Sequence, residues 1–128
     1  MVNPPSAGQL LEAVSAFLRD EALPALQGAA AYKARVAASM LDIVRRELVL
    51  APDARVREEQ ALRELLGERS GTTDALTRTL CERIANDAID LDTPGVATFL
   101  WQITLDKLAV DQPGYDTYRA ALARNDTE

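Results

Sequence analysis

The chain has 128 residues, a length typical of one domain, and a net charge of −6. This acidity argues against nucleic acid or an anionic membrane as the main partner. The single cysteine cannot form an internal disulfide, and no run approaches the about 18 apolar residues of a membrane span. We therefore expect a soluble cytoplasmic protein whose single domain spans 1–128, with a loose leader at 1–5 and a disordered tail at 124–128.

Histidine is absent from the whole sequence. Its absence removes the Ser-His-Asp triad, most zinc sites and the di-iron carboxylate pattern. Cys81 lacks the histidine base that usually activates a thiol, so we expect a half-buried packing residue. An aspartate cluster at 87–92 lacks the glycine and terminal glutamate of a calcium loop. These absences favour a protein that is not an enzyme and that has no cofactor and no metal site.

Alanine, leucine, arginine and glutamate dominate, and β-branched residues never alternate over the length of a strand. The fold class is therefore all-α. Ser6 and Gln9 have the spacing of a capping box, which predicts the start of the first helix. Pro24 should end or kink that helix near residues 22–23, because proline cannot donate within a helix interior.

A second helix is predicted at 29–50, and Pro52 should prevent it from continuing. Asp53 is a good N-cap for a third helix at 54–66. The apolar positions of this third helix are expected to be buried; they are Ala61, Leu62, Leu65 and Leu66.

A fourth helix should begin at Thr72 or Thr73, and a short sixth helix should span 116–123. Helical spacing predicts which side chains of the fourth helix are buried: Leu76, Leu80, Ile84 and Ala88. For the sixth helix, the side chains expected to pack back are Tyr118, Ala121 and Leu122.

The fifth helix is predicted at 93–111, with Thr93 as N-cap and Pro94 at the first helical position. It is apolar around most of its circumference, except for a narrow polar strip formed by Gln102 and Asp106. Such a helix belongs inside a bundle, with Trp101 in the core. The sequence thus predicts a single bundle of about five main helices, with the fifth helix central and the second helix its principal partner.

Glu47 and Lys107 are the chemical oddities, because each falls within the apolar sector of its helix. If the second and fifth helices pack together, these residues and Asp111 form a candidate buried polar cluster. A structural ion pair, or a lysine that extends to water near a helix C-terminus, is the favoured interpretation. A small acid–base pocket or a carboxylate-binding site is the alternative.

A candidate surface for an anion or a partner flanks the turn expected between the second and third helices. Its basic residues can bind phosphate or carboxylate, although acidic neighbours dilute their charge. Tyr115 follows a Pro-Gly pair in a loop and is a candidate interface anchor. The basic residues are Arg45, Arg46, Arg55 and Arg57.

Three stretches carry a resemblance that covers most of the chain. They read LLEAVSAFLRDEALPAL, KARVAASMLDIVRRELVL and TLDKLAVDQPGYDTYR. The chain resembles an uncharacterised bacterial family of small helical proteins, a domain of unknown function. Family loops often read Asn-Pro where this chain has Gln112-Pro113, and Asn where it has Ser39. The matching motif positions are Arg35, Arg45, Glu47, Asp106, Lys107, Asp111, Pro113 and Tyr115.

The resemblance implies a gene setting beside an aminoglycoside-phosphotransferase-like kinase and an acyl-CoA dehydrogenase. The leading hypothesis is a non-catalytic accessory protein that binds one of these, through the turn after the second helix and residues 113–118. A binding module for a carboxylate or acyl-CoA, with Lys107 and the arginines as contacts, is the second hypothesis. An enzyme using Glu47 and Lys107 as acid and base is the third, and a homo-oligomer is compatible with all three.

Overall fold

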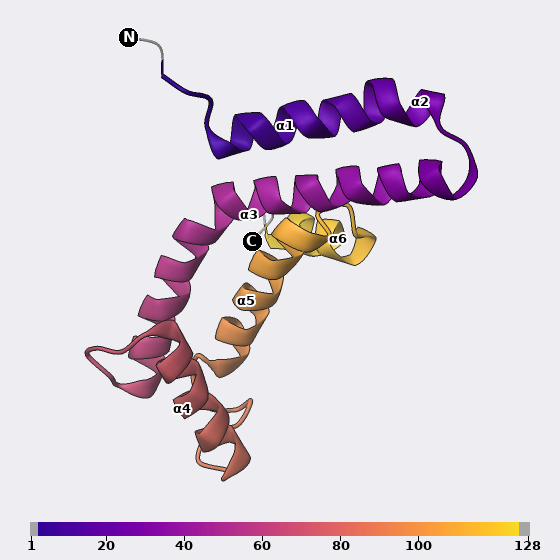
Figure 1. Ribbon diagram of the computed structural model, residues 1–128. Helices are drawn as coiled ribbons and strands as arrows, with labels where there is room; N and C mark the ends of the chain where they lie inside the picture. The colour runs from indigo at the N-terminus through magenta and orange to yellow at the C-terminus, as the bar shows by residue number, and fades with distance from the viewer. Residues whose placement is uncertain (1–2, 126–128) are drawn as a thin grey trace. The chain divides into compact units, whose positions relative to one another are not determined.

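The computed structural model describes residues 3–125 (Figure 1). Every regular element in that range is helical, which confirms the all-α class. None of the helices formed by these residues has the length and apolar character needed to cross a bilayer. The chain divides into two compact units, Met1–Val49 (the first unit) and Leu50–Glu128 (the second unit). The single domain expected over 1–128 stays a prediction.

The first unit begins with α1, Ala7–Phe17. The backbone N–H of Ser6 donates to Gln9 Oε1 at 2.8 Å, and the N–H of Gln9 donates to Ser6 Oγ at 3.2 Å. The predicted capping box is therefore confirmed, and it supplies partners for two N–H groups that the helix leaves free. Of the predicted leader, residues 3–5 have no regular structure, and residues 1–2 lie outside the described range.

The predicted interruption before Pro24 takes the form of a π-helical segment, η1, Leu18–Ala22. The N–H of Leu23 donates to the carbonyl of Leu18, five residues back, so the helix widens there. Pro24 then lies in α2, Leu23–Ala25, which follows η1 without a break in the helical backbone. The chain therefore stays helical to Ala25 before it turns.

The helices predicted at 29–50 and 54–66 are one continuous helix, α3, Gly28–Leu66, with Pro52 inside it. The prediction that Pro52 ends a helix is wrong. Proline removes one N–H donor and strains the preceding turn, a cost that a helix of 39 residues accommodates here. Asp53 is consequently an interior residue of α3 and not an N-cap.

The second unit contains the end of α3 together with α4, Thr73–Ala85, α5, Val96–Asp111, and α6, Asp116–Asn125. Its largest fully buried side chains are Leu62 and Val96, both 0% exposed. The buried core joins three helices and the loop before α5; it comprises Leu62, Leu66, Leu76, Leu80, Ile89, Val96 and Phe99. The expected burial of the apolar positions at the end of α3 is confirmed, with Ala61 and Leu65 partly buried against this core.

Helix α4 has the predicted N-cap, because Thr72 Oγ1 accepts the N–H of Ala75 at 3.2 Å. Burial of the first two of its four predicted positions is confirmed, but Ile84 is exposed and Ala88 is exposed beyond the helix end. The helical spacing does not extend past Ala85, since the chain turns through Asp87 at φ 64°. Ile89 enters the core instead.

Helix α5 begins at Val96 with Gly95 as N-cap, so the predicted Thr93 cap is wrong. The hydroxyl of Thr93 instead accepts the N–H of Asp90 at 3.0 Å, and the Asp90 carboxylate accepts the N–H of Thr93 at 3.1 Å. These bonds shape the loop before the helix. Trp101, expected in the core, is 48% exposed.

Helix α5 is central to the second unit because it contributes to two apolar clusters. Its first half enters the main core, whereas Leu105 packs with Tyr118 and Ala121 of α6. Burial of these two α6 residues is confirmed, but Leu122 is exposed. Residues 124 and 125 belong to α6 and not to a disordered tail, and residues 126–128 of that predicted tail lie outside the described range.

Candidate functional site

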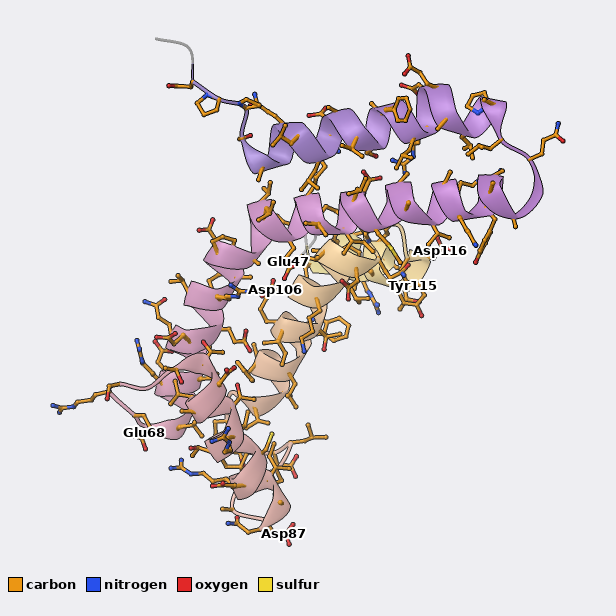
Figure 2. All side chains as sticks on the ribbon, viewed as in Figure 1. Glu47, Glu68, Asp87, Asp106, Tyr115 and Asp116 are labelled. Atoms are coloured by element: carbon orange, nitrogen blue, oxygen red, sulfur yellow. The ribbon has the colours of Figure 1, made fainter. Side chains whose placement is uncertain are left out.

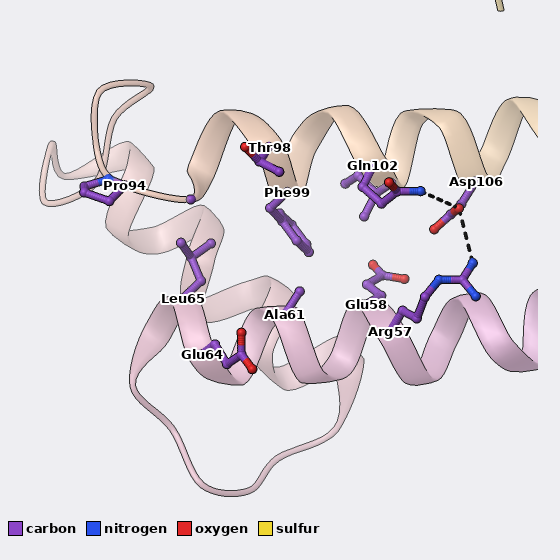
Figure 3. Close-up of a pocket in the computed structure, with 12 residues that line it drawn as sticks. Arg57, Glu58, Ala61, Glu64, Leu65, Pro94, Thr98, Phe99, Gln102 and Asp106 are labelled. Carbon is purple, nitrogen blue, oxygen red and sulfur yellow. Dashed lines mark hydrogen bonds and ion pairs between the residues drawn. The ribbon is translucent and has the colours of Figure 1, made fainter. Parts of the chain in front are cut away.

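An open cavity of about 560 Å³ lies between α3 and α5 of the second unit and is here called the α3–α5 groove (Figure 3). Residues 57–65 of α3 and 98–106 of α5 contribute to its lining, together with Pro94 and Gly95 from the loop before α5. The lining residues are Arg57, Glu58, Ala61, Glu64, Leu65, Pro94, Gly95, Thr98, Phe99, Gln102, Ile103 and Asp106.

Four apolar side chains form the floor of the α3–α5 groove. Ala61 and Leu65 are one turn apart on α3, and Phe99 and Ile103 are one turn apart on α5. This spacing puts each pair on one face of its helix. The small side chain of Ala61 leaves space above the core, so the floor is accessible and apolar.

A polar network crosses one end of the α3–α5 groove. Arg57 Nη2 donates to Asp106 Oδ1 at 3.4 Å, and Gln102 Nε2 donates to the same oxygen at 3.0 Å (Figure 3). The Asp106 side chain is 19% exposed, whereas Arg57 is more than half exposed. The ion pair neutralises the one arginine of the lining, so this end carries little net charge.

The walls of the α3–α5 groove are acidic. Glu58 is half-buried and Glu64 is exposed. Within residues 3–125, neither carboxylate has an ion pair or a side-chain hydrogen bond. With Asp106 matched by Arg57, these two unpaired carboxylates give the groove a negative potential.

The opposite end depends on Gly95, which caps α5 with φ 89°. Residues with a Cβ rarely adopt this backbone conformation. A Cβ at this position would also lie 3.4 Å from Leu65 Cδ1 on the groove floor. Glycine therefore permits the tight entry into α5 and the close approach of that entry to α3.

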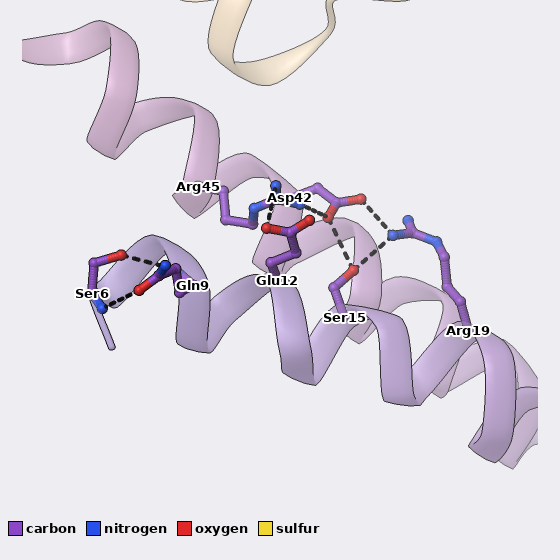
Figure 4. Close-up of polar contacts among 7 residues, drawn as sticks. All are labelled: Ser6, Gln9, Glu12, Ser15, Arg19, Asp42 and Arg45. Atoms are coloured by element: carbon purple, nitrogen blue, oxygen red, sulfur yellow. Dashed lines mark hydrogen bonds and ion pairs between the residues drawn. The ribbon is translucent and has the colours of Figure 1, made fainter. Parts of the chain in front are cut away.

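The first unit holds a different polar site, the Asp42 cluster, made of Glu12, Ser15, Arg19, Asp42 and Arg45 (Figure 4). Ser15 is 3% exposed; its hydroxyl donates to Asp42 Oδ1 at 3.0 Å and accepts from Arg19 Nη1 at 2.8 Å. Arg19 also pairs with Asp42 Oδ2 at 2.6 Å, and Arg45 lies 3.6 Å from Oδ1. The cluster thus links α1 and η1 to the first part of α3.

The charge of Asp42 is favoured by its neighbours. Burial raises the pKa of Asp42, but hydrogen bonds from Arg19 and Ser15 and the charges of Arg19 and Arg45 outweigh it and hold the pKa below its usual range. The carboxylate is therefore ionised at neutral pH, and its role is to fix the contact between helices.

The candidate buried polar cluster falls in both units. Glu47 lies in the first unit (Figure 2), and Lys107 and Asp111 lie in the second. All three residues are exposed. The side chains of these residues are therefore not buried as expected, and the neighbouring apolar side chains on their helices are only partly buried. The pairing of Glu47 with Lys107 stays a prediction.

The predicted anion or partner surface was expected beside a turn between two helices. That turn does not exist, because α3 is continuous there. Arg45 belongs to the Asp42 cluster and also lies 3.7 Å from Glu12, whereas Arg57 pairs with Asp106 in the α3–α5 groove. Arg46 lies in the first unit and Arg55 in the second, so a shared basic surface stays a prediction. Tyr115, directly before α6, is 52% exposed and remains available as an anchor (Figure 2).

Cys81 is exposed on α4 and not half-buried as expected. In the aspartate cluster, the Asp90 carboxylate accepts hydrogen bonds from the backbone N–H groups of Asp92 and Thr93 and so shapes the loop before α5. No group of metal-ligating side chains is found among the described residues.

The sequence analysis missed the α3–α5 groove and the Asp42 cluster. The polar strip of Gln102 and Asp106 on an otherwise apolar helix was the available signal, because polar residues there need a partner. Nothing local indicates that Arg57 supplies it. Ser15 and Asp42 are 27 residues apart, and neither stands out in its own helix.

No curated protein and no solved structure matches the sequence. Residues 24–115 match the family DUF6285, a domain of unknown function, and this range covers most of the chain and the whole α3–α5 groove. The expected membership of an uncharacterised family is therefore confirmed: the chain belongs to the DUF6285 family.

Proposed function

We propose that this protein is a non-catalytic accessory protein that acts by binding another protein. The observation that supports this most is the α3–α5 groove, whose apolar floor is open along the surface of the second unit and not closed around a small molecule. The groove lies within the residues that define the family match, which suits a function shared by its members.

The partners we propose are the aminoglycoside-phosphotransferase-like kinase or the acyl-CoA dehydrogenase implied by the resemblance in sequence. An accessory role beside either enzyme would place this protein in acyl-CoA metabolism. We propose the cytoplasm as its compartment, because a chain with one cysteine does not need an oxidising environment to fold.

A small-ligand module for a carboxylate or an acyl-CoA is the second candidate. The cavity volume favours it, since about 300–1,000 Å³ is usual for small-molecule sites. The wall charge disfavours it, because Glu58 and Glu64 would repel a carboxylate or a phosphate. We therefore rank protein binding first.

The test is co-expression of the tagged full chain with each candidate enzyme, followed by size-exclusion chromatography. We expect a stoichiometric complex with one of them. Thr98→Arg, which places a long cation in the groove, should reduce complex formation, whereas Ala97→Arg adds the same charge on the same helix outside the lining and should not. A chain that binds neither enzyme but gains thermal stability with octanoyl-CoA would favour the small-ligand module.

A further inference from the structure

Resting on the proposed function, we infer that the occupant of the α3–α5 groove is a basic amphipathic helix of the partner protein. Its apolar side chains contact the floor formed by Ala61, Leu65, Phe99 and Ile103, and its lysines or arginines pair with Glu58 and Glu64. Three features of the groove support this occupant: its length, its apolar floor and its charge.

The length of the groove suits a helix of about three turns. Its lining runs from Arg57 to Leu65 on α3 and from Gly95 to Asp106 on α5. With a rise of about 1.5 Å per residue, these spans are roughly 12 and 16 Å long. A bound helix anchors in such a groove through side chains at i, i+4, i+7 and i+11, which cover about 16 Å.

The floor suits a third helix packed against two existing ones. The apolar side chains come from both helices, two from α3 and two from α5, so the depression between the helices has an apolar lining on each side. A ridge of large apolar side chains from another helix fits such a depression at ordinary helix-packing distance. Ala61 provides the space for the central anchor.

The charge selects a cationic occupant. Glu58 is half-buried yet has no cationic partner within the described part of the chain, and a carboxylate partly withdrawn from water is stabilised by an added cation. Glu64 lies on the same wall and also lacks a partner there. Because Arg57 is already paired with Asp106, no free cation in the lining competes for these carboxylates.

The probe is a fluorescein-labelled helical peptide of about 14 residues, with leucines at i, i+4, i+7 and i+11 and lysines between them. A second peptide has glutamate in place of every lysine. Fluorescence polarisation with the full chain should give at least about tenfold tighter binding of the basic peptide. Thr98→Arg should weaken that binding by about tenfold or more, because it adds bulk and like charge, and Ala97→Arg should leave it nearly unchanged.

The charge itself is tested with exposed carboxylates, whose removal leaves the fold intact. Glu64→Gln should weaken binding of the basic peptide by about two- to fivefold, as expected for an exposed ion pair. Glu82→Gln, on the exposed surface of α4, is the matched control because it changes the net charge by the same amount. It should leave the affinity for the basic peptide nearly unchanged.

Equal affinity for both peptides, or equal effects of the groove and control variants, would overturn the inference. So would octanoyl-CoA displacing the basic peptide, because the groove would then hold an anionic acyl ligand. These outcomes are distinct from failure of the proposed function. A partner enzyme that binds Thr98→Arg as well as the unmodified chain keeps the accessory role and removes only the groove as its site.

Discussion

The two units are both helical, but their helices are held together by different means. The second unit has an apolar core in which Leu62 and Val96 are completely buried. Among residues 3–49 of the first unit, the buried residues are small, namely Ser15, Ala34 and Ala38. None of its larger described apolar side chains is fully buried: Leu11 of α1 is half-buried, and Leu10, Val14 and Phe17 are exposed.

The difference teaches what each kind of contact contributes. Burial of large apolar side chains supplies most of the free energy of folding, at about 25 cal/mol for each Å² removed from water. A charged network such as the Asp42 cluster contributes less net free energy, but it is directional and so defines which residues face each other. We therefore expect the second unit to dominate stability and the Asp42 cluster to set the alignment of α1 against α3.

The largest expected effect is on the core of the second unit. Leu62→Ala should lower the free energy of unfolding by roughly 2–5 kcal/mol, because it leaves a cavity at a fully buried site. Leu10→Ala is the matched change on α1, where the side chain is exposed, and should cost about 0.5 kcal/mol or less. Urea denaturation followed by circular dichroism measures both, and similar costs would show that the apolar face of α1 is covered in solution.

The next effect concerns the Asp42 cluster. Asp42→Asn removes a charge that accepts hydrogen bonds from Ser15 and Arg19, and should cost roughly 1.5–3 kcal/mol at neutral pH. Asp20→Asn, at an exposed position in η1, is the control and should change little.

The same cluster predicts a pH dependence. The pKa of Asp42 is lowered in the folded state, so its contribution is complete above the pKa of the unfolded chain and is lost as the pH falls through the folded pKa. The stabilities of the unmodified chain and of Asp42→Asn should therefore converge in acid. A difference that persists after Asp42 is protonated would mean that the substitution acts through packing and not through charge.

A smaller effect is expected at the entry to α5. Gly95→Ala should cost about 1–2 kcal/mol, because alanine is strained at a positive φ. Gly114→Ala is the control, since a Cβ there meets nothing within 4 Å and its φ is not in the left-handed region. Thermal melts of the two variants should separate by several degrees. An equal melting temperature would contradict the role assigned to the Gly95 conformation.

The smallest expected effect is a gain in stability from replacing Pro52. Pro52→Ala restores an N–H donor inside α3 and should raise the free energy of unfolding by about 1 kcal/mol, less than the full propensity difference, because the helix already accommodates proline. Amide exchange at residues 49–55 should slow in the variant. Unchanged exchange there, or a loss of stability, would indicate that the proline itself favours the local conformation.

Sequence alone determined the features that depend on neighbouring residues. The all-α class, the Ser6–Gln9 capping box, the Thr72 cap and a helix over 116–123 follow from spacing and capping chemistry within a few residues. Family membership also follows from sequence, because the match extends over residues 24–115. None of these depends on which helices meet.

Tertiary structure decided what depends on distant residues. The local pattern did not decide whether α3 continues through Pro52, because one missing N–H is a cost that the rest of a 39-residue helix can offset. Ser15 is hydrogen-bonded to Asp42, 27 residues away in the sequence, and Arg57 is hydrogen-bonded to Asp106, 49 residues away. The α3–α5 groove arises from such a long-range meeting of two helix faces, so its shape and charge follow from packing and from no motif in the sequence.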